Sequence, residues 1–180
     1  FEGHTITYAD PGRRVRHGIV QVPGGKAIFP SLTVAENLQA GAYTYIWDSE
    51  RLVARIEEVV ELFPRLAERF DQPAGTLSGG EQQMLAIAKA LLLEPRVLLI
   101  DELSLGLAPV VVQELLEVVE RLAEGGMTIV VVEQSVNVAL SMASRAIFME
   151  KGQVRFEGAA ADLLERDDLL RAVFLGGDGG

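Results

Sequence analysis

The sequence of 180 residues has no cysteine and only two histidines, His4 and His17. The lack of cysteine excludes disulfides, zinc ribbons, iron–sulfur clusters and cysteine nucleophiles, and two histidines leave little material for a histidine-ligated metal site. No apolar run approaches the roughly 18 residues that a membrane-spanning helix needs, and the first residues do not form a secretory signal. We therefore expect a soluble protein without thiol chemistry.

Basic residues are also scarce in this chain. Its 16 lysines and arginines stand against 26 aspartates and glutamates, which gives a formal net charge of −10. A protein that binds nucleic acid through its phosphates needs the opposite balance, so the composition argues against a nucleic-acid partner. With 49% apolar and 23% charged residues, the chain can bury a core, and its length suits a single domain.

The first part of the chain predicts a short helix followed by a strand. Asp10 and Pro11 form a typical helix start, and residues 19–22 are an apolar, β-branched run closed by a proline and two glycines. Residues 6–8 resemble the end of a strand, and the chain does not begin with methionine, so we expect a missing upstream segment. The arginines of the short helix are interpreted as a solvated face: Arg13, Arg14 and Arg16.

Residues 26–76 are predicted to be mainly helical. Thr33 and Glu36 form a capping-box pattern that starts one helix near Val34. Between residues 49 and 63 the apolar side chains recur every three or four positions, which indicates an amphipathic helix, and Pro64 discourages its continuation.

The second half of the chain alternates apolar runs with a helical pattern. Residues 97–100 and 128–132 are continuous apolar runs that predict parallel strands covered on both faces, and residues 111–123 have helical spacing between them. This order predicts a βαβ unit. Residues 145–157 predict a hairpin, and residues 162–174 a final helix.

One helix of this half begins at two glycines. Ser78 and Glu81 form a capping box, so the helix starts at Gly79 and Gly80 with its first amides unpaired. Exposed amides, the positive end of the helix dipole and a serine hydroxyl suit a phosphate group. Taken alone, such a start is more often only a cap.

Two carboxylates follow the apolar run 97–100. Asp101 and Glu102 stand at the carboxyl end of the predicted strand, where open α/β sheets bind ligands. The first carboxylate can act on Mg²⁺ and the second can polarise an attacking water. Many α/β proteins also end a strand in acids without any such role, so the pair alone leaves both readings open.

Together these segments resemble the signature motif, Walker B and D-loop of ATP-binding cassette (ABC) ATPases. The stretches VPGGKAIFPSLTVAENL (22–38), AGTLSGGEQQMLAIAKALLLEPRVLLIDELSLGLAP (74–109) and GMTIVVVEQSVNVAL (126–140) are most similar to the ATPase subunits of branched-chain amino acid importers. The resemblance implies an α/β fold, a P-loop NTPase-like core of mostly parallel sheet with flanking helices, incomplete at its N-terminus. It further implies a helical subdomain at about 26–76, a core at about 77–144 and a C-terminal hairpin and helix at 145–180.

The same resemblance implies a role for each motif. The signature residues would contact the ATP of a partner subunit, Asp101 would support Mg²⁺ through water, and Glu102 would be the general base. Gln134 occupies the position of the usual switch histidine, and Gly24 that of the usual Q-loop glutamine. The positions implied to contact ATP or to form the D-loop are Ser78, Gly79, Gly80, Glu81, Gln82, Ser104, Leu105 and Gly106.

Several positions depart from the family pattern. No window fits the P-loop G-x-x-x-x-G-K-[ST], and the nearest one, residues 24–27, lacks the first glycine and the hydroxyl. We therefore expect the 180 residues alone to bind ATP poorly and to be inactive. Glutamine at position 134 can hydrogen-bond a phosphate but cannot carry a proton charge. Leu103 replaces a usual proline, a change expected to affect loop stiffness more than chemistry.

The resemblance implies an ATP- and Mg²⁺-dependent ATPase at the inner face of the cell membrane. Its partners would be a second ATPase subunit, identical or different, transmembrane permease subunits and, indirectly, an external solute-binding protein. Tyr43, Tyr45 and Trp47 are either core residues or contacts of the permease. Two alternatives remain: an ABC ATPase acting on DNA or the ribosome, and a regulatory module that donates its signature without hydrolysing ATP.

Overall fold

The computed structural model describes residues 1–25 and 27–164, in two compact units that divide between Val132 and Glu133. The first unit contains α1 (Pro11–Arg16), β1 (Ile19–Val22), α2 (Val34–Gly41), α3 (Ser49–Glu61), α4 (Pro64–Ala67), the 3-10 turn η1 (Ala74–Thr76), α5 (Gly79–Leu91), β2 (Val97–Asp101), α6 (Pro109–Glu124) and β3 (Thr128–Val132). The second contains α7 (Val136–Met142), β4 (Arg145–Glu150), β5 (Gln153–Ala159) and α8 (Ala160–Leu164).

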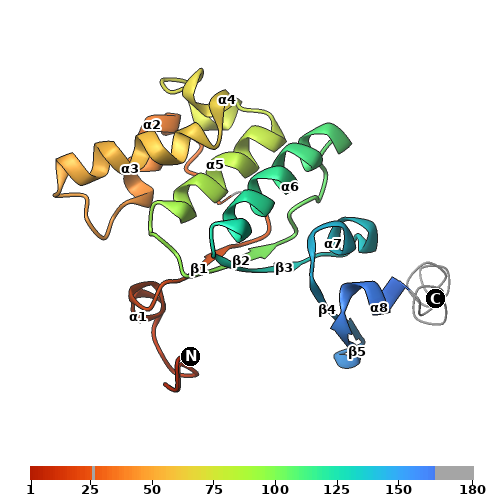
Figure 1. Cartoon of the computed structure of the whole chain (residues 1–180). Helices are drawn as coiled ribbons and strands as arrows, with labels where there is room; N and C mark the ends of the chain where they lie inside the picture. Colours follow the sequence, from red (N-terminus) through yellow and green to blue (C-terminus); the bar gives the residue numbers. More distant parts are fainter. Residues whose placement is uncertain (26, 165–180) are drawn as a thin grey trace. The chain divides into compact units, whose positions relative to one another are not determined.

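The first unit is built on a parallel sheet in the order β1–β2–β3. Ile19 pairs with Val97, and Val97 in turn pairs with Thr128, so the carboxyl ends of all three strands meet at one edge. Helices α5 and α6 lie side by side across one face of this sheet (Figure 1). Their fully buried side chains, with those of β2, form the core: Leu85, Ile87, Leu98, Ile100 and Leu115. The predicted α/β fold with a βαβ unit is confirmed.

The expectation that both strands of the βαβ unit are covered on two faces is wrong for β3. Val130 is 47% exposed and Val132 61% exposed. Across the part of the chain that the structure describes, α6 packs against β3 from one side, and the opposite side chains of the strand remain open. A continuous apolar run indicates that a strand is hydrophobic, but it does not indicate whether helices cover one or both faces of that strand.

The expectation of a strand at residues 6–8 is also wrong. Residues 1–9 form two local turns instead, in which the amide of His4 donates to the carbonyl of Phe1 and the amide of Ala9 to that of Ile6. A strand needs a neighbouring strand to pair its backbone groups, and here local turns bond them instead. The short helix that follows is as predicted, because the Asp10 carboxylate accepts from the Arg13 amide at 2.9 Å, and its three arginines are exposed.

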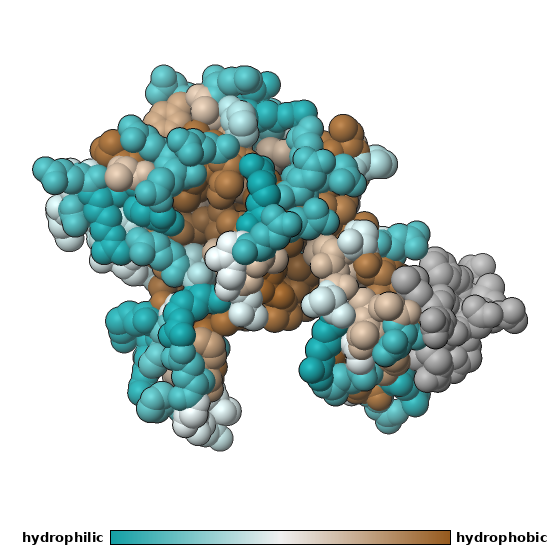
Figure 2. All heavy atoms as spheres, in the orientation of Figure 1, coloured by the Kyte–Doolittle hydropathy of each residue, from teal (hydrophilic) through white to brown (hydrophobic). Residues whose placement is uncertain are grey.

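In the mainly helical block of residues 26–76, the predicted capping box is present. The Thr33 hydroxyl accepts from the Glu36 amide at 3.1 Å, and the Glu36 carboxylate accepts from the Thr33 amide at 2.8 Å. Pro64 does more than discourage α3 from continuing, since it opens the four-residue helix α4. Figure 2 shows hydrophilic side chains over the outward faces of these helices and apolar ones between them.

The three aromatic residues of this block divide between core and surface. Tyr45 is 9% exposed, and its hydroxyl donates to the carbonyl of Leu92. Tyr43 is 53% exposed and Trp47 is 96% exposed. Of the two alternatives given for these residues, Tyr45 is therefore a core residue and the other two belong to the surface.

In the second unit, β4 and β5 form the predicted antiparallel hairpin. Arg145 pairs with Ala159 and Glu150 with Gln153, with a register shift between Phe148 and Met149. The predicted final helix begins slightly earlier than expected, at Ala160. The rest of that prediction, residues 165–174, lies outside the described residues.

Candidate functional site

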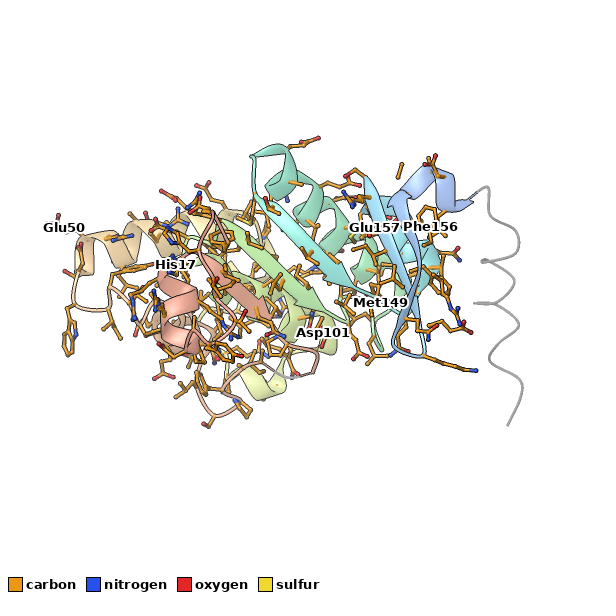
Figure 3. All side chains as sticks on the ribbon, turned by 90° about the horizontal axis from the view of Figure 1, so that it is seen from below. His17, Glu50, Asp101, Met149, Phe156 and Glu157 are labelled. Carbon is orange, nitrogen blue, oxygen red and sulfur yellow. The ribbon has the colours of Figure 1, made fainter. Side chains whose placement is uncertain are left out.

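The acid pair lies where the sequence places it, at the carboxyl end of the central strand. Asp101 is the last residue of β2 (Figure 3), and the amide of Glu102 donates to the carbonyl of Val132 at 2.9 Å. Glu102 has a φ of 55°, in the left-handed region. That conformation costs about 1–2 kcal/mol for a residue with a side chain. The backbone is therefore strained at the second acid, as it often is at functional positions.

Gly24 lies against both carboxylates. A Cβ atom at this position would stand 3.1 Å from Oε2 of Glu102 and 3.6 Å from Oδ2 of Asp101. The parallel register causes this proximity, because Val22 of β1 pairs with Ile100 of β2 and the loops after the two strands leave the sheet together. The structure thus brings together three predicted site residues, and any side chain at position 24 would crowd the Glu102 carboxylate.

The two carboxylates of this cluster suit one hard cation whose other coordinating ligands are water and phosphate oxygens. Mg²⁺ prefers oxygen ligands and is commonly bound by one or two carboxylates together with waters and phosphates. Asp101 and Glu102 supply two carboxylates beside the small space at Gly24. Residues 1–25 and 27–164 contain no group of three or more acidic, histidine or cysteine side chains that could hold a metal by themselves. The residues fit a Mg²⁺–phosphate ligand better than a metal held by protein alone.

The helix that begins at the two glycines is capped as predicted. The amide of Ser78 donates to Oε2 of Glu81 at 2.8 Å, and the amide of Glu81 donates to the Ser78 hydroxyl at 3.3 Å. Ser78 and Gly79 are exposed. Gly80 is buried, and a Cβ atom there would stand only 2.3 Å from Cγ1 of Val111 at the start of α6. The exposed first residues of α5 thus lie next to a closely packed contact between α5 and α6.

The side chains of Glu81 and Gln82 are turned into the protein. Glu81 is 8% exposed and Gln82 is 9% exposed. The Gln82 amide donates to the carbonyl of Leu77 at 3.0 Å and that of Ala74 at 3.4 Å. Burial acts to raise the pKa of the Glu81 carboxyl, but hydrogen bonds from Ser78 and nearby arginine charges outweigh it, so the pKa lies below 4.5. Their contact with the ATP of a partner stays a prediction.

The loop after the acid pair forms a tight turn that follows a buried side chain. The amide of Leu107 donates to the carbonyl of Ser104 at 3.1 Å, and Gly106 has a φ of 71°. Leu105 is 64% exposed, whereas Leu103 is fully buried. A Cβ atom on Gly79 would stand 3.6 Å from Cδ2 of Leu107, so this loop and the glycine helix start are neighbours.

Gln134 belongs to the second unit, where it follows β3 and precedes α7. It is exposed, and the next residue, Ser135, caps α7 through its hydroxyl. The structure therefore brings Gly24 to Asp101 and Glu102, and Gly79 to Leu107 of the loop after the acid pair. The role of Gln134 beside the acid pair stays a prediction.

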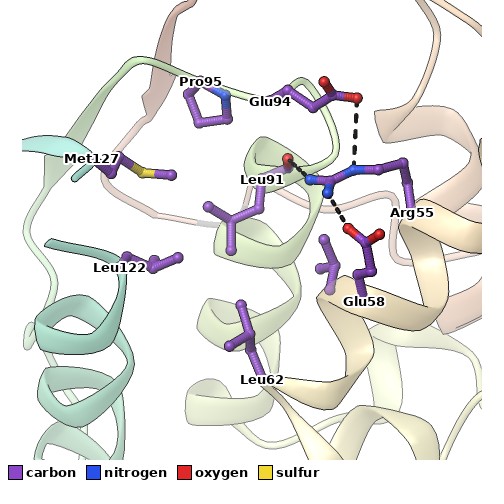
Figure 4. A pocket seen from close by; sticks show the side chains of 9 residues that line it. Arg55, Glu58, Leu62, Leu91, Glu94, Pro95, Leu122 and Met127 are labelled. Atoms are coloured by element: carbon purple, nitrogen blue, oxygen red, sulfur yellow. Dashed lines mark hydrogen bonds and ion pairs between the residues drawn. The ribbon is translucent and has the colours of Figure 1, made fainter. Parts of the chain in front are cut away.

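A pocket of about 230 Å³ lies at the opposite edge of the sheet from the acid pair. Pro95 and Met127, which precede β2 and β3, help to line it (Figure 4). The guanidinium of Arg55 at this pocket already contacts Glu58, Glu94 and the carbonyl of Leu91. The pocket therefore has no spare positive charge for a phosphate, and it does not mark the site.

Three contacts at the site could not be predicted from the sequence: those of Gly80 with Val111, of Gly24 with Glu102, and of Arg69 with Glu81. Each joins residues that are at least twelve positions apart, with no periodicity or motif between them. Only the folded chain shows that they meet.

Comparison with known proteins places this geometry in a family. The family model described as "ABC transporter" matches residues 1–104. The chain is 43% identical over 177 residues to the high-affinity branched-chain amino acid transport ATP-binding protein BraG of Pseudomonas aeruginosa, covering 98% of this chain and 75% of the relative. It is 39% identical over 168 residues to the probable branched-chain amino acid transport ATP-binding protein LivF of Archaeoglobus fulgidus, covering 93% and 70%.

A solved structure shares the same fold. An ATP-binding cassette of an ABC transporter in its ADP conformation superimposes with a TM-score of 0.83 at 24% identity, over 98% of this chain and 75% of the other. Within the described residues, no helix is both long and apolar enough to cross a membrane.

Proposed function

Because the chain belongs to the ABC transporter family of ATP-binding proteins, we propose that it drives solute import as the ATP-hydrolysing subunit. The observation that carries this proposal is the packing of Gly24 against Asp101 and Glu102 at the carboxyl edge of the sheet. It places two carboxylates beside a residue without a side chain, where a metal-bound phosphate would be received. Residues 26–76 would then be the helical subdomain, 77–144 the core and 145–180 the C-terminal segment.

The two acids have separate roles in this proposal. Asp101 would help to hold Mg²⁺, and the bound metal would neutralise phosphate charge. Glu102 accepts a hydrogen bond from the attacking water and orients it, as a general base does. The left-handed backbone of Glu102, held by the hydrogen bond to Val132, fixes where this carboxylate starts from the strand end. Gln134 would hydrogen-bond the terminal phosphate.

The glycine helix start serves a different nucleotide. Its exposed residues Ser78 and Gly79 would contact the terminal phosphate of an ATP held by a second ATPase subunit, through the Ser78 hydroxyl and the Gly79 amide. Residues 104–106, which lie beside this start, would face the same subunit boundary. Two subunits, identical or different, then enclose two ATP molecules, and each site takes its acids from one chain and its signature from the other.

We propose amino acids with branched side chains as the solute, because both relatives are named for their transport. The partners would be transmembrane permease subunits and a solute-binding protein outside the membrane. The ATPase would be peripheral on the cytoplasmic face. Measuring ATP-dependent uptake of leucine, isoleucine and valine by the reconstituted transporter tests this proposal, and uptake of an unrelated solute alone would refute it.

The catalytic assignment is tested by Glu102→Gln in the full-length subunit. The amide keeps the shape of the side chain but cannot take a proton from water, so turnover is expected to fall by about 10²-fold or more. ATP-dependent dimerisation is expected to persist, because the variant still binds nucleotide. Unchanged turnover would show that Glu102 has no part in hydrolysis.

A regulatory module is the second candidate, favoured by the absence of a P-loop window from the 180 residues. Such a module would lend its signature to another ATPase without hydrolysing ATP itself. Calorimetric titration with ATP and Mg²⁺ of this chain beside the full-length subunit separates the two. Binding only by the full-length subunit favours the ATPase, whereas binding by neither, combined with stimulation of a partner ATPase, favours the module. Tight binding by the 180 residues alone would contradict the expectation that they bind ATP poorly.

A further inference from the structure

We propose that Arg69 is a positioning residue for α5, the signature helix that begins at Gly79, and that it holds the start of this helix in place through Glu81. Nε of Arg69 lies 3.1 Å from Oε1 of Glu81. The other oxygen of the same carboxylate accepts the amide hydrogen of Ser78 at 2.8 Å. The two oxygens thus have two separate partners, and together these partners fix the plane of the carboxylate.

The burial of Glu81 makes this contact consequential. The residue is 8% exposed, and its carboxylate lies on the first turn of α5. An ionised carboxylate removed from water needs charged or hydrogen-bonding partners to stay in place. Without Arg69, Oε1 would lose this cationic contact and keep only the weaker Coulombic influence of Arg65, and rotation of the carboxylate toward solvent would break the bond to Ser78.

Arg69 itself is held by the segment that leads to the signature. Its amide donates to the carbonyl of Leu66, and its carbonyl accepts from the amide of Gln72. The following residues are bonded to the start of α2, with the amide of Val34 donating to the carbonyl of Gln72 at 3.0 Å. The guanidinium therefore extends from a fixed turn, as a side chain that positions another must.

The chain offers a matched control four residues earlier. Arg65 on α4 forms an ion pair with Glu114 of α6, at 2.6 Å, and both side chains are partly exposed. This pair also joins two helices, but it does not touch the capping box. Removing Arg65 therefore costs one surface arginine and one ion pair while the contact between Arg69 and Glu81 stays intact.

The inference about Arg69 rests on the proposed function only for its effect on a partner's ATP. Its local part is tested by hydrogen exchange at the Ser78 amide in the 180-residue chain. Arg69→Gln is expected to speed this exchange by about fivefold or more, Arg69→Lys to restore part of the protection, and Arg65→Gln to leave it unchanged. Equal exchange rates in the parent chain and Arg69→Gln would overturn the inference.

The functional part uses the full-length subunit carrying Glu102→Gln, with ATP-driven dimerisation as the readout. Adding Arg69→Gln is expected to raise the ATP concentration at half-maximal dimerisation by about tenfold, while ATP binding to the monomer stays the same. Adding Arg65→Gln is expected to change neither quantity. If Arg69→Gln speeds exchange at Ser78 but dimerisation is unaffected, the positioning role stands and the proposed role of the signature fails.

Discussion

Gly80 illustrates how a single position in this molecule is fixed by a distant neighbour. A Cβ atom there would stand 2.3 Å from Cγ1 of Val111, far inside normal contact distance. Gly80→Ala is therefore expected to push α5 and α6 apart and to lower the free energy of unfolding by about 1–3 kcal/mol. Denaturant unfolding of the 180-residue chain measures the loss.

The adjacent glycine is the control for this prediction. A Cβ atom on Gly79 meets only Cδ2 of Leu107, at the ordinary distance of 3.6 Å. Gly79→Ala is expected to change stability by less than about 1 kcal/mol, because alanine also favours the helix. Adding Val111→Ala to Gly80→Ala should recover part of the loss. Equal stabilities of the two single variants would contradict the packing argument.

The carboxyl group of Glu81 is expected to make the free energy of unfolding depend on pH. Burial would raise the pKa of its carboxyl, but Ser78 and the neighbouring arginines bring it below the ordinary 4.5. A carboxyl with a lowered native pKa stabilises the folded state fully above pH 4.5 and loses this contribution as the pH falls further. The difference in unfolding free energy between the parent chain and Glu81→Gln should therefore shrink below that pH. A constant difference down to about pH 3 would contradict the prediction.

Residues with local partners could be predicted, and residues with distant partners could not. Ser78 and Glu81 are three positions apart, so their reciprocal cap was visible in the sequence and is confirmed. Asp101 and Glu102 were placed correctly because a strand end is a local feature. The approach of Gly24 to Glu102 depends on the register of two strands, which no short motif encodes.

At the scale of elements, the same rule separates the confirmed predictions from the wrong ones. The periodicity of apolar residues located α3 and α6, a capping box located the start of α5, and apolar runs located β1 to β3. The expected strand at residues 6–8 and the double coverage of β3 were wrong, because both depend on what lies beside the segment. Pairing and layering are properties of the assembled sheet, so composition alone does not determine them.

The loop before α2 provides an element-scale prediction that depends on one buried side chain. Asn37 is fully buried; its amide donates to the carbonyls of Phe29 and Thr33 at 2.9 Å, and its oxygen accepts from the Phe29 amide at 2.8 Å. Asn37→Leu keeps the branching of the side chain but removes the partners of the Phe29 amide and carbonyl, which should cost about 2–4 kcal/mol of unfolding free energy.

The control for this loop lies on the same helix. Gln39 is exposed on α2, so Gln39→Leu makes the same chemical change without a buried partner and should shift stability by less than about 0.5 kcal/mol. Thermal unfolding of both variants measures the difference. If Asn37→Leu were as stable as Gln39→Leu, the loop would not depend on the asparagine.

At the scale of the whole molecule, we propose that the acid pair and the signature start serve different nucleotides. The acid pair borders Gly24, whereas the signature start borders Leu107 and Val111. In the proposed dimer, each complete site therefore combines the acids of one subunit with the signature of the other. A single chain contributes half of each site, and the arrangement can be tested by distributing two substitutions over two subunits.

Glu102→Gln disables the acids of one chain, and Ser78→Arg blocks its exposed signature start with a bulky side chain. Placed on opposite subunits of a full-length dimer, both substitutions fall in the same composite site and leave the other site intact. Placed on one subunit, they damage both sites. Single-turnover ATP hydrolysis should therefore persist at one site in the opposite-chain dimer and be lost from both in the same-chain dimer. The reverse result, with hydrolysis retained by the same-chain dimer and lost from the opposite-chain dimer, would mean that the signature acts on the nucleotide of its own chain.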